Sequence, residues 1–542
     1  MNLIDDLIHR LEQLNEIGTA LSKERDITRL LENILNAAKT ITHADGGTLY
    51  RVTNDRKALQ FEILKNDSLN IAMGGSSGKP IEFRNLPLFD DQGKNNDSLV
   101  AAYAAIHGQT VNISDAYTEP NFDFSGTRQF DAQTGYRSKS FLAVPMKDQE
   151  GDVVGVFQLI NAIQPQSGEV VSFSTADQSL AESLASQAAI AITNRNLMSQ
   201  LEVLFESFIR LINLAIDEKS PYTGGHCQRV PVLTMMLAEA VNATEHGPLA
   251  SFTMNERDRY ELKIAGLLHD CGKITTPVHV VDKASKLQTL FDRIDLIDTR
   301  FEVLKRDQEI SALRTQLALR EPKNAAAEAA IWSQYLTTID ALNADREFLR
   351  ATNKGAEAMK ESDLQRVRDI GLRYVWRDVN GKDAEFLSAN EIENLTIRAG
   401  TLTSAERETI NHHIVATIKM LEQLPWPKHL KNVPEYAGGH HERMDGKGYP
   451  KGLTRNQMSV QARIMGITDI FEALTACDRP YKSGMKLSQA MGIMHKLRLG
   501  GHIDPDIFDI FVNEGVYRRY GEEFLNPWQI DEVNPQTWSA GL

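Results

Sequence analysis

Hydrophobic and polar positions change their spacing twice along this chain of 542 residues. Residues 1 to about 40 follow helical spacing, and from Gly46 apolar residues gather in short β-rich stretches bounded by turn residues. The clearest strands are "GGTLYRVT", "ALQFEILK", "SFLAVPMK" and "DVVGVFQLINA", and the last two are expected to form a hairpin. Helical spacing returns after Phe173, with Ser174 or Thr175 as N-cap. The first region is therefore predicted to be an α+β domain, an antiparallel sheet with flanking helices.

The long helix after Phe173 carries an apolar seam at heptad spacing, formed by Leu197, Leu201, Leu204, Phe208 and Leu211. Two interpretations follow. The helix packs on its own domain, or a two-stranded coiled coil joins two protomers into a homodimer. In either case we expect residues 196–215 to form a helical linker between domains.

Strands nearly vanish beyond residue 215, so the rest is predicted to be an all-α domain with an insertion. From about residue 286 two apolar stripes at helical spacing are separated by "REPKN" (Arg320 to Asn324), where proline ends a helix. This pattern predicts a long antiparallel helical hairpin. The expected domains are residues 1–195, the linker 196–215, the helical domain 216–515 with its insertion at about 286–400, and a C-terminal tail 516–542.

Composition narrows the function classes. Lys and Arg total 59 against 73 Asp and Glu, a formal net charge of −14, which disfavours broad binding of DNA. A small anionic substrate would need local cations or metal ions. The three cysteines form no disulfide framework, and we find neither a signal peptide nor a membrane-spanning stretch, so a cytoplasmic location is expected.

Histidines and aspartates of the helical domain suggest a metal centre. Most histidines are surface or core residues, and nine of the 14 are expected to be so: His9, His43, His107, His246, His279, His412, His429, His495 and His502. The others, with two aspartates, could hold Mn, Fe, Zn or similar ions. Two such ions about 3.5–4 Å apart activate water and stabilise a phosphoryl oxyanion, which suits phosphodiester hydrolysis. The candidate ligands are His226, His269, Asp270, His413, His440, His441 and Asp469.

Four segments together are highly specific: "HDCGKI", "HHERMDGKGYP", "ITDIFEALTACDRPYK" and "GGHIDPDIFDIF". They resemble the HD-GYP family of cyclic di-nucleotide phosphodiesterases, within the HD hydrolase superfamily, over residues 213 to 515. The insertion and the segment after it resemble a GAF-linked subgroup. Membership would imply hydrolysis of cyclic di-GMP, or of a related dinucleotide such as cyclic GMP-AMP, to a linear product and on to mononucleotide.

The resemblance also implies roles for individual residues. The seven candidates above would be the metal ligands, with Asp270 as the bridging carboxylate. Lys273 would contact the scissile phosphate, while Arg479 and Lys482 would hold the phosphates and guanine of the substrate. Two ions, Fe or Mn, are expected. Some members hold a third ion through an acidic residue where this chain has Tyr222, and Glu218 or Asp217 are the alternatives here.

The loop "AGGHHERMDGKGYP" would place His440 and His441 toward the metal ions. Its glycines allow backbone angles that other residues resist, so the loop can fold tightly at the pocket rim. The motif residues Gly448, Tyr449 and Pro450 would close its far end. In the family this motif is also a docking surface for diguanylate cyclase (GGDEF) domains, which are a second candidate partner.

The N-terminal region resembles GAF domains over about residues 13 to 195. Asn161, Phe173 and Asp177 match the NKFDE signature of cyclic-nucleotide-binding members, but Ala162 and Gln178 replace its lysine and glutamate. The three matching residues mark a candidate ligand pocket for a cyclic nucleotide. The alternative is a GAF domain that only dimerises.

Three functions remain open from the sequence. The first is a metal-dependent phosphodiesterase regulated by the GAF domain. The second is a catalytically weak sensor or scaffold that binds a cyclic dinucleotide or a cyclase partner. The third is another HD-superfamily hydrolase that acts on a nucleoside phosphate, which the second histidine pair and the "RPYK" segment disfavour.

Overall fold

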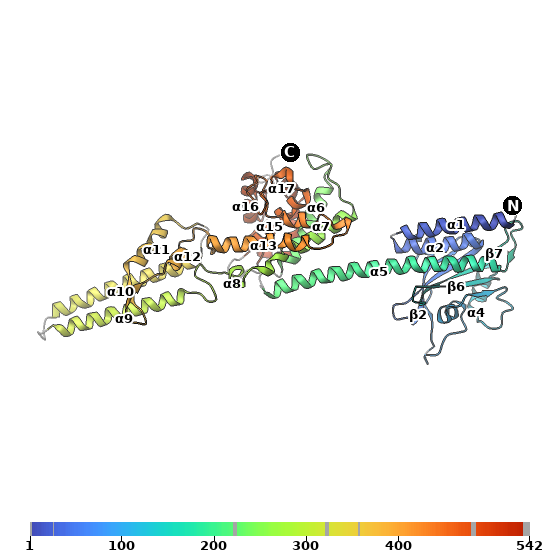
Figure 1. Cartoon of the computed structure of the whole chain (residues 1–542), viewed down its shortest axis with the longest axis horizontal. Coiled ribbons are helices and arrows are strands. Elements are labelled where there is room, and N and C mark those ends of the chain that lie inside the picture. The colour runs from blue at the N-terminus through green and yellow to red at the C-terminus, as the bar shows by residue number, and fades with distance from the viewer. Residues whose placement is uncertain are drawn as a thin grey trace. The chain divides into compact units, whose positions relative to one another are not determined.

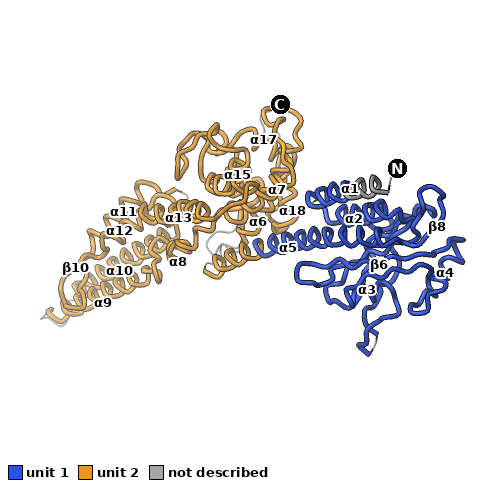
Figure 2. The backbone as a smooth tube through the Cα atoms, turned by 45° about the vertical axis from the view of Figure 1, so that its right-hand side comes forward, with its two compact units in different colours: residues 1–205 blue, residues 206–542 orange. Residues whose placement is uncertain are grey.

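The computed structural model of the chain divides into two units, residues 1–205 and residues 206–542 (Figure 2). The boundary falls within one continuous helix, α5 (Thr175–Lys219). All three cysteines are free thiols. The structure describes residues 3–24, 26–90, 92–219, 225–319, 325–355, 358–477 and 484–534.

The first unit is built on an eight-stranded antiparallel sheet with the order β3-β2-β1-β7-β6-β5, where β4 pairs with β2 and β8 with β7. The predicted hairpin is confirmed, because the last two expected strands pair antiparallel as β6 and β7. The strands are β1 Ala44–Val52, β2 Ala58–Asn66, β3 Ile71–Gly74, β4 Leu86–Pro87, β5 Val111–Ile113, β6 Phe141–Lys147, β7 Val153–Ile163 and β8 Val170–Val171.

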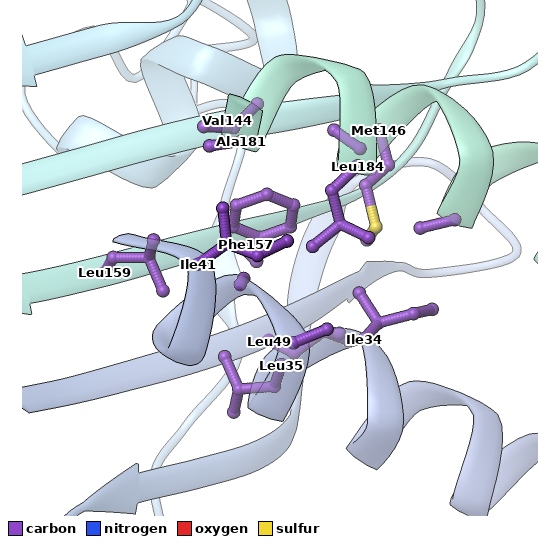
Figure 3. Close-up of a cluster of buried hydrophobic side chains, with 14 of the residues drawn as sticks. Ile34, Leu35, Ile41, Leu49, Val144, Met146, Phe157, Leu159, Ala181 and Leu184 are labelled. Atoms are coloured by element: carbon purple, nitrogen blue, oxygen red, sulfur yellow. The ribbon is translucent and has the colours of Figure 1, made fainter. Parts of the chain in front are cut away.

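Helices cover both faces of this sheet (Figure 1). Along β7, Phe157 and Leu159 point into one core and Val156 and Ile160 into the other, as the alternation of side chains along a strand requires. The first core joins the sheet to α1 (Leu3–Lys23), α2 (Ile27–Thr42) and the start of α5, and Figure 3 shows part of it. The second core lies against α3 (Val100–His107), and η1 (Gly75–Ser77) and α4 (Ser125–Thr134) complete the unit.

The second unit is mainly helical. Its helices outside the insertion are α6 His226–Asn242, α7 Glu256–Leu268, η2 Cys271–Thr275, α8 Val278–Val281, α13 Ser404–Glu422, η3 Lys428–Leu430, α14 Val433–Gly438, η4 Arg455–Gln457, α15 Val460–Thr475, α16 Leu487–Leu499, α17 Pro505–Asn513, α18 Val516–Phe524 and η5 Pro527–Gln529. Within the described residues, no helix combines the length and the apolar composition that crossing a bilayer requires.

The insertion is a folded subdomain, more than the predicted hairpin. Its elements are α9 Ile294–Ala318, α10 Ala325–Asn353, α11 Glu361–Arg373, β9 Val375–Arg377, β10 Asp383–Glu385 and α12 Ala389–Leu395. Helices α9 and α10 lie antiparallel, joined by ion pairs such as Arg350–Asp298 at 2.5 Å (Figure 1). Phe301, Leu349 and Phe386 share one buried core. The helices α9, α10 and α11 and the β9–β10 hairpin therefore fold together.

Two elements of the structure begin or end at other residues than the predicted boundaries. The first apolar stripe of the insertion is predicted to start at about residue 286, but α9 begins at Ile294, and Leu290 before it is 92% exposed. The predicted tail from residue 516 is folded through its described part, because Tyr517 and Tyr520 of α18 are each only 1% exposed. These rings contact Phe471 and Phe511 of the helical core, so the domain extends beyond residue 515.

Candidate metal centre

Five separate elements of the second unit bring the seven predicted ligands together. His226 is the first residue of α6, and His269 and Asp270 directly follow α7. His413 lies within α13, Asp469 within α15, and the pair His440 and His441 follows α14. The ligand atoms form two groups, each within 4.8 Å: His226, His269, Asp270 and Asp469, and His413, His440 and His441.

Three of the histidine rings are oriented in the same way. The Nδ1 atoms of His269, His413 and His440 lie 2.7, 2.6 and 2.6 Å from the backbone carbonyl oxygen three residues earlier. A carbonyl only accepts, so each Nδ1 donates, and each Nε2 of the neutral ring keeps its lone pair for the cluster. This is the orientation that metal-binding histidines have when a carbonyl fixes the tautomer. The neighbouring His412 is exposed, as predicted.

Asp270 lies between the two groups. Its Oδ2 is 3.1 Å from His226 Nε2 and 3.2 Å from His269 Nε2, while its Oδ1 is 3.2 Å from His413 Nε2. One oxygen therefore faces each group, which is the arrangement of a bridging carboxylate.

The donor set fits a pair of divalent ions. Asp270 Oδ1 and His440 Nε2 are buried and have no hydrogen-bond partner among the described residues. Nε2 atoms approach one another to 3.3 Å between His226 and His269 and to 3.1 Å between His413 and His441. Lone pairs at such distances repel unless a metal ion or a proton lies between them. Imidazole and carboxylate together suit Mn, Fe or Zn.

Metal binding needs deprotonated ligands, and the pKa shifts of four of the seven favour it. His226 differs, because burial is outweighed by the charge of Glu472 and by hydrogen bonds to carboxylates, which raise its pKa well above the usual value. Burial opposes the charge of Asp270, but Lys273 and His269 hold its pKa well below the usual value. The pKa of Asp469 is likewise well below the usual value, because hydrogen bonding and charge from His226 outweigh burial. Burial and the neighbouring His269 lower the pKa of His440 to about 4. Burial and His440 lower the pKa of His441 well below the usual value.

His226 is held differently, by a carboxylate that sequence reasoning missed. Its Nδ1 lies 2.5 Å from Glu472 Oε2, and the fully buried Glu472 also accepts from Arg229 Nε at 2.7 Å. Such carboxylate partners orient the ring and raise its basicity. The available signal was spacing: Glu472 lies three residues after Asp469 on α15, and Arg229 three after His226 on α6, hence on the same helix faces.

Lys273 adds a positive charge directly beside the bridging carboxylate, with its Nζ 2.5 Å from Asp270 Oδ2. Burial disfavours the ammonium, but Asp270 and Asp469 raise the pKa of Lys273 above its usual value. Among the alternatives for a third ion, Glu218 is exposed, whereas Asp217 Oδ1 is buried without a hydrogen-bond partner in the described chain. Arg479 and Lys482, the predicted substrate contacts, lie outside the described residues, as does Tyr222 at the position of the family's third-ion ligand.

The glycine-rich loop holds His441 in place. A Cβ at Gly448 would come within 2.4 Å of Arg443 N, so only glycine fits there. The Tyr449 ring stacks on the His441 ring with centroids 4.8 Å apart and an angle of 21°. The buried Glu442 accepts from Lys451 N at 2.7 Å and Leu453 N at 2.8 Å, which closes the loop, and Pro450 is exposed.

The three signature residues of the first unit support its own fold. Asn161, at φ 56°, accepts from Lys139 N at 2.7 Å and donates to Arg137 O and Tyr136 Oη, both at 2.9 Å. Phe173 lies in the core, and Asp177 accepts from Ser174 N at 2.9 Å at the start of α5.

A cavity of about 340 Å³ in this unit is lined by residues from β1, α3 and the β6–β7 turn, and by none of the three. The structure therefore places the signature residues away from this cavity.

Comparison with known proteins agrees with this architecture. The GAF domain family model matches residues 26–192, and two HD domain models match residues 223–357 and 387–507. A solved GAF domain from an Acinetobacter phosphoenolpyruvate-protein phosphotransferase is 18% identical, covering 35% of this chain and 98% of its own, with a TM-score of 0.26. At that score the likeness carries no argument, so the domain assignment rests on the family models.

Curated relatives match shorter segments. The 3′3′-cGAMP-specific phosphodiesterases 1 and 3 of Vibrio cholerae are 45% identical over 80 residues and 37% identical over 111 residues, respectively 15% and 20% of this chain. A cyclic di-GMP phosphodiesterase of Pseudomonas aeruginosa is 36% identical over 152 residues, 28% of this chain. The chain spans only 18%, 23% and 34% of the lengths of these three relatives.

Proposed function

We propose that this chain, which carries a GAF domain followed by an HD domain, is a metal-dependent phosphodiesterase. Its substrate would be cyclic di-GMP or 3′,3′-cyclic GMP-AMP, and its first product the linear dinucleotide. The observation that carries the proposal is the convergence of seven donor residues, five buried and two half-buried, into two groups that both face Asp270. The printed activities of the relatives above support the substrate class.

Each part of the site has a chemical task in this proposal. Two divalent ions, Fe or Mn, would supply an attacking water of lowered pKa and would stabilise charge on the phosphoryl oxygens. Asp270 would hold the two groups at a fixed separation, while Glu472 fixes the orientation of the His226 ring. Lys273 would move from Asp270 to a phosphate oxygen and stabilise the charge that develops there. It also places a positive charge beside the reacting centre of a chain whose net charge is −14.

A homodimer and a cytoplasmic location are further parts of this proposal. The heptad seam on α5 is exposed within the single chain, since Leu197, Leu201, Leu204, Phe208 and Leu211 are 51–63% exposed. On the same helix Ile209 and Ile216 are only 2% exposed, so two different faces of α5 are apolar. A second copy of the chain would cover the seam as a coiled coil. Light scattering should give a dimer for the wild type and a monomer for Leu204→Glu.

The test pairs metal analysis with product identification. Protein purified without oxygen and loaded with Mn²⁺ or Fe²⁺ should contain two ions per chain and convert cyclic di-GMP or cyclic GMP-AMP to a linear product, identified by mass. Asp270→Ala should lose both properties. A wild type that binds metal and both dinucleotides without hydrolysing either would contradict the proposal and favour a sensor or scaffold.

A further inference from the structure

We infer that Asn213 and Lys219 of α5 are positioning residues that clamp both ends of the segment carrying His269, Asp270 and Lys273. The kinetic consequence of this clamp rests on the proposed function, whereas its consequence for metal binding does not. Both contacts lie within the second unit, so they are independent of how the two units are arranged.

The first contact holds the end of α7. Asn213 is 6% exposed, and its Nδ2 donates to Leu267 O at 2.9 Å. Leu267 lies in the last turn of α7, where carbonyls lack an N–H partner within the helix. The carbonyl of the preceding residue, Gly266, accepts from His269 Nδ1 at 2.7 Å. Helix α5 therefore holds the peptide next to the one that orients a metal ligand.

The second contact holds the other end of the segment. Lys219 Nζ donates to the carbonyl of Ile274, and Ile274 directly follows Lys273. Lys273 in turn reaches back to Asp270 Oδ2 at 2.5 Å. A displacement of the C-terminal end of α5 would therefore move the backbone that carries Lys273.

Helix α13 holds the middle of the same segment. Gly272 N donates to Thr417 Oγ1 of α13 at 2.9 Å, and a Cβ at Gly272 would lie 2.0 Å from His413 O. The middle is thus fixed against the helix that supplies His413. Each end also has one polar contact to α5, so the position of α5 contributes to how the segment lies relative to the second ligand group.

The clamp belongs to one face of α5. Ile209, Asn213 and Ile216 are buried and follow helical spacing, while the heptad seam lies on another face. A rotation of α5 about its axis would withdraw Asn213 from Leu267 O. The same helix begins in the core of the GAF domain, where Leu184 and Ala188 are fully buried. A change in that core that turns α5 would reach the metal ligands through these two contacts.

The experiment compares Asn213→Leu and Lys219→Met with a matched control. The control is Lys263→Met, which removes the half-exposed Lys263–Glu206 ion pair at 3.2 Å, another polar contact between α5 and α7 that lies away from the ligands. Isothermal titration of the 542-residue chain with Mn²⁺ is the primary measurement, and thermal unfolding confirms that each variant folds. Lys219 is partly exposed, so its variant tests the clamp even if Asn213→Leu misfolds.

We expect Asn213→Leu and Lys219→Met each to weaken Mn²⁺ binding about tenfold, the lower end of what loss of an orienting contact to a ligand costs. With substrate, kcat should fall while KM is unchanged, and Lys219→Arg should restore both properties because it keeps the donor. Lys263→Met should match the wild type. Wild-type Mn²⁺ affinity in both clamp variants would overturn the inference. An equal loss of affinity in the control would also overturn it, because any contact that packs α5 on the domain would then have the same effect.

Failure of the proposed function gives a different result. If the wild type binds Mn²⁺ but hydrolyses neither dinucleotide, the assignment of the enzyme is wrong. The loss of Mn²⁺ affinity in the two clamp variants would still support the clamp in that case.

Discussion

At the metal centre, buried polar atoms of the motif residues have no partner in the described chain, whereas the amide of Asn161 in the GAF domain is fully bonded. The atoms without a partner among the described residues at the candidate metal centre are Asp270 Oδ1 and His440 Nε2. Asn161 has two acceptors for its Nδ2 and accepts two backbone N–H groups at its Oδ1. An unpartnered buried polar group costs about 1–3 kcal/mol. The candidate metal centre tolerates this cost where ligands are expected, and the Asn161 side chain avoids it.

The comparison separates two uses of a sequence signature. In the HD domain the signature residues converge on a space that a cation would fill. In the GAF domain they hold the domain's own backbone, in particular the segment from Tyr136 to Ser140. Substitutions in the first group should therefore change metal binding and turnover, and substitutions in the second should change stability.

The largest effect is expected for Asp270→Ala, which removes the only side chain that faces both ligand groups with an oxygen, as far as the described residues show. Turnover should fall by about 10³-fold or more, because the ions lose their common ligand and the charge at the reacting centre changes. Metal content should fall below two ions per chain, measured by elemental analysis. The control Asp177→Asn, at the start of α5 in the GAF domain, should keep wild-type metal content. Full metal content in Asp270→Ala would contradict the bridging role.

Gly448→Ala should have the next largest effect. The new Cβ would lie 2.4 Å from Arg443 N and 2.5 Å from Glu442 Cα, both backbone atoms that cannot rotate away. The loop must shift, and with it Tyr449 and the stacked His441 ring. A displacement of about 1 Å at a reacting centre can reduce turnover about 10²-fold, and steady-state kinetics should show a loss of that order.

The control for this loop variant is Gly126→Ala, where nothing lies within 4 Å of the new Cβ. Its kinetics should equal those of the wild type. Unchanged kinetics in Gly448→Ala would show that the loop, and hence its tyrosine, has no influence on His441.

Asn161→Ala should leave the metal centre intact and loosen the GAF domain. The variant removes four hydrogen bonds of a buried side chain and places alanine at a positive φ, so the first unit should lose about 2–4 kcal/mol of stability. Hydrogen exchange of residues 136–140 should become faster, while Mn²⁺ affinity stays at the wild-type value. Slow exchange together with loss of a bound cyclic nucleotide would instead favour a ligand pocket at this position.

Much of the metal centre was predictable because its ligands lie in short contiguous motifs. His269 and Asp270 are neighbours, as are His440 and His441, and each pair follows the end of a helix. When two ligands are neighbours in the sequence, placing the end of one helix at the site places both of them. By contrast, Glu472 is a single glutamate on a helix, and only the position of α6 against α15 turns it toward His226 rather than toward solvent.

The fold shows the same distinction between local and long-range determinants. The β6–β7 hairpin follows from alternation and a tight turn, both local features. Helix α18 has the sequence "VYRRYGEEF", which is mostly polar, and its two tyrosines are buried only because neighbouring helices, among them α6, α15 and α17, form a site for them. The strands β9 and β10 are short and mostly polar as well, and their pairing depends on the core around Phe386.

The smallest expected effect concerns Lys286, a buried ammonium group that has hydrogen-bond acceptors but, among the described residues, no carboxylate to balance its charge. Lys286 is 1% exposed, and its Nζ donates to Leu395 O at 3.1 Å and Ile397 O at 2.7 Å, with no carboxylate partner among the described residues. Burial lowers the pKa of Lys286 to about 8, whereas an unfolded lysine titrates near 10.4.

Between about pH 8 and pH 10 the unfolded chain therefore binds more protons at Lys286 than the folded chain does. The contribution of Lys286 to the free energy of unfolding should then increase as pH rises, by on the order of 1–2 kcal/mol. Below pH 8 both states are protonated, and this contribution should not change. Urea unfolding of wild type and Lys286→Met across this range isolates the effect, because other lysines and tyrosines titrate alike in both proteins. A constant difference between the two from pH 7 to pH 10 would show that the carbonyls of α12 and its following turn stabilise the ammonium as well as water does.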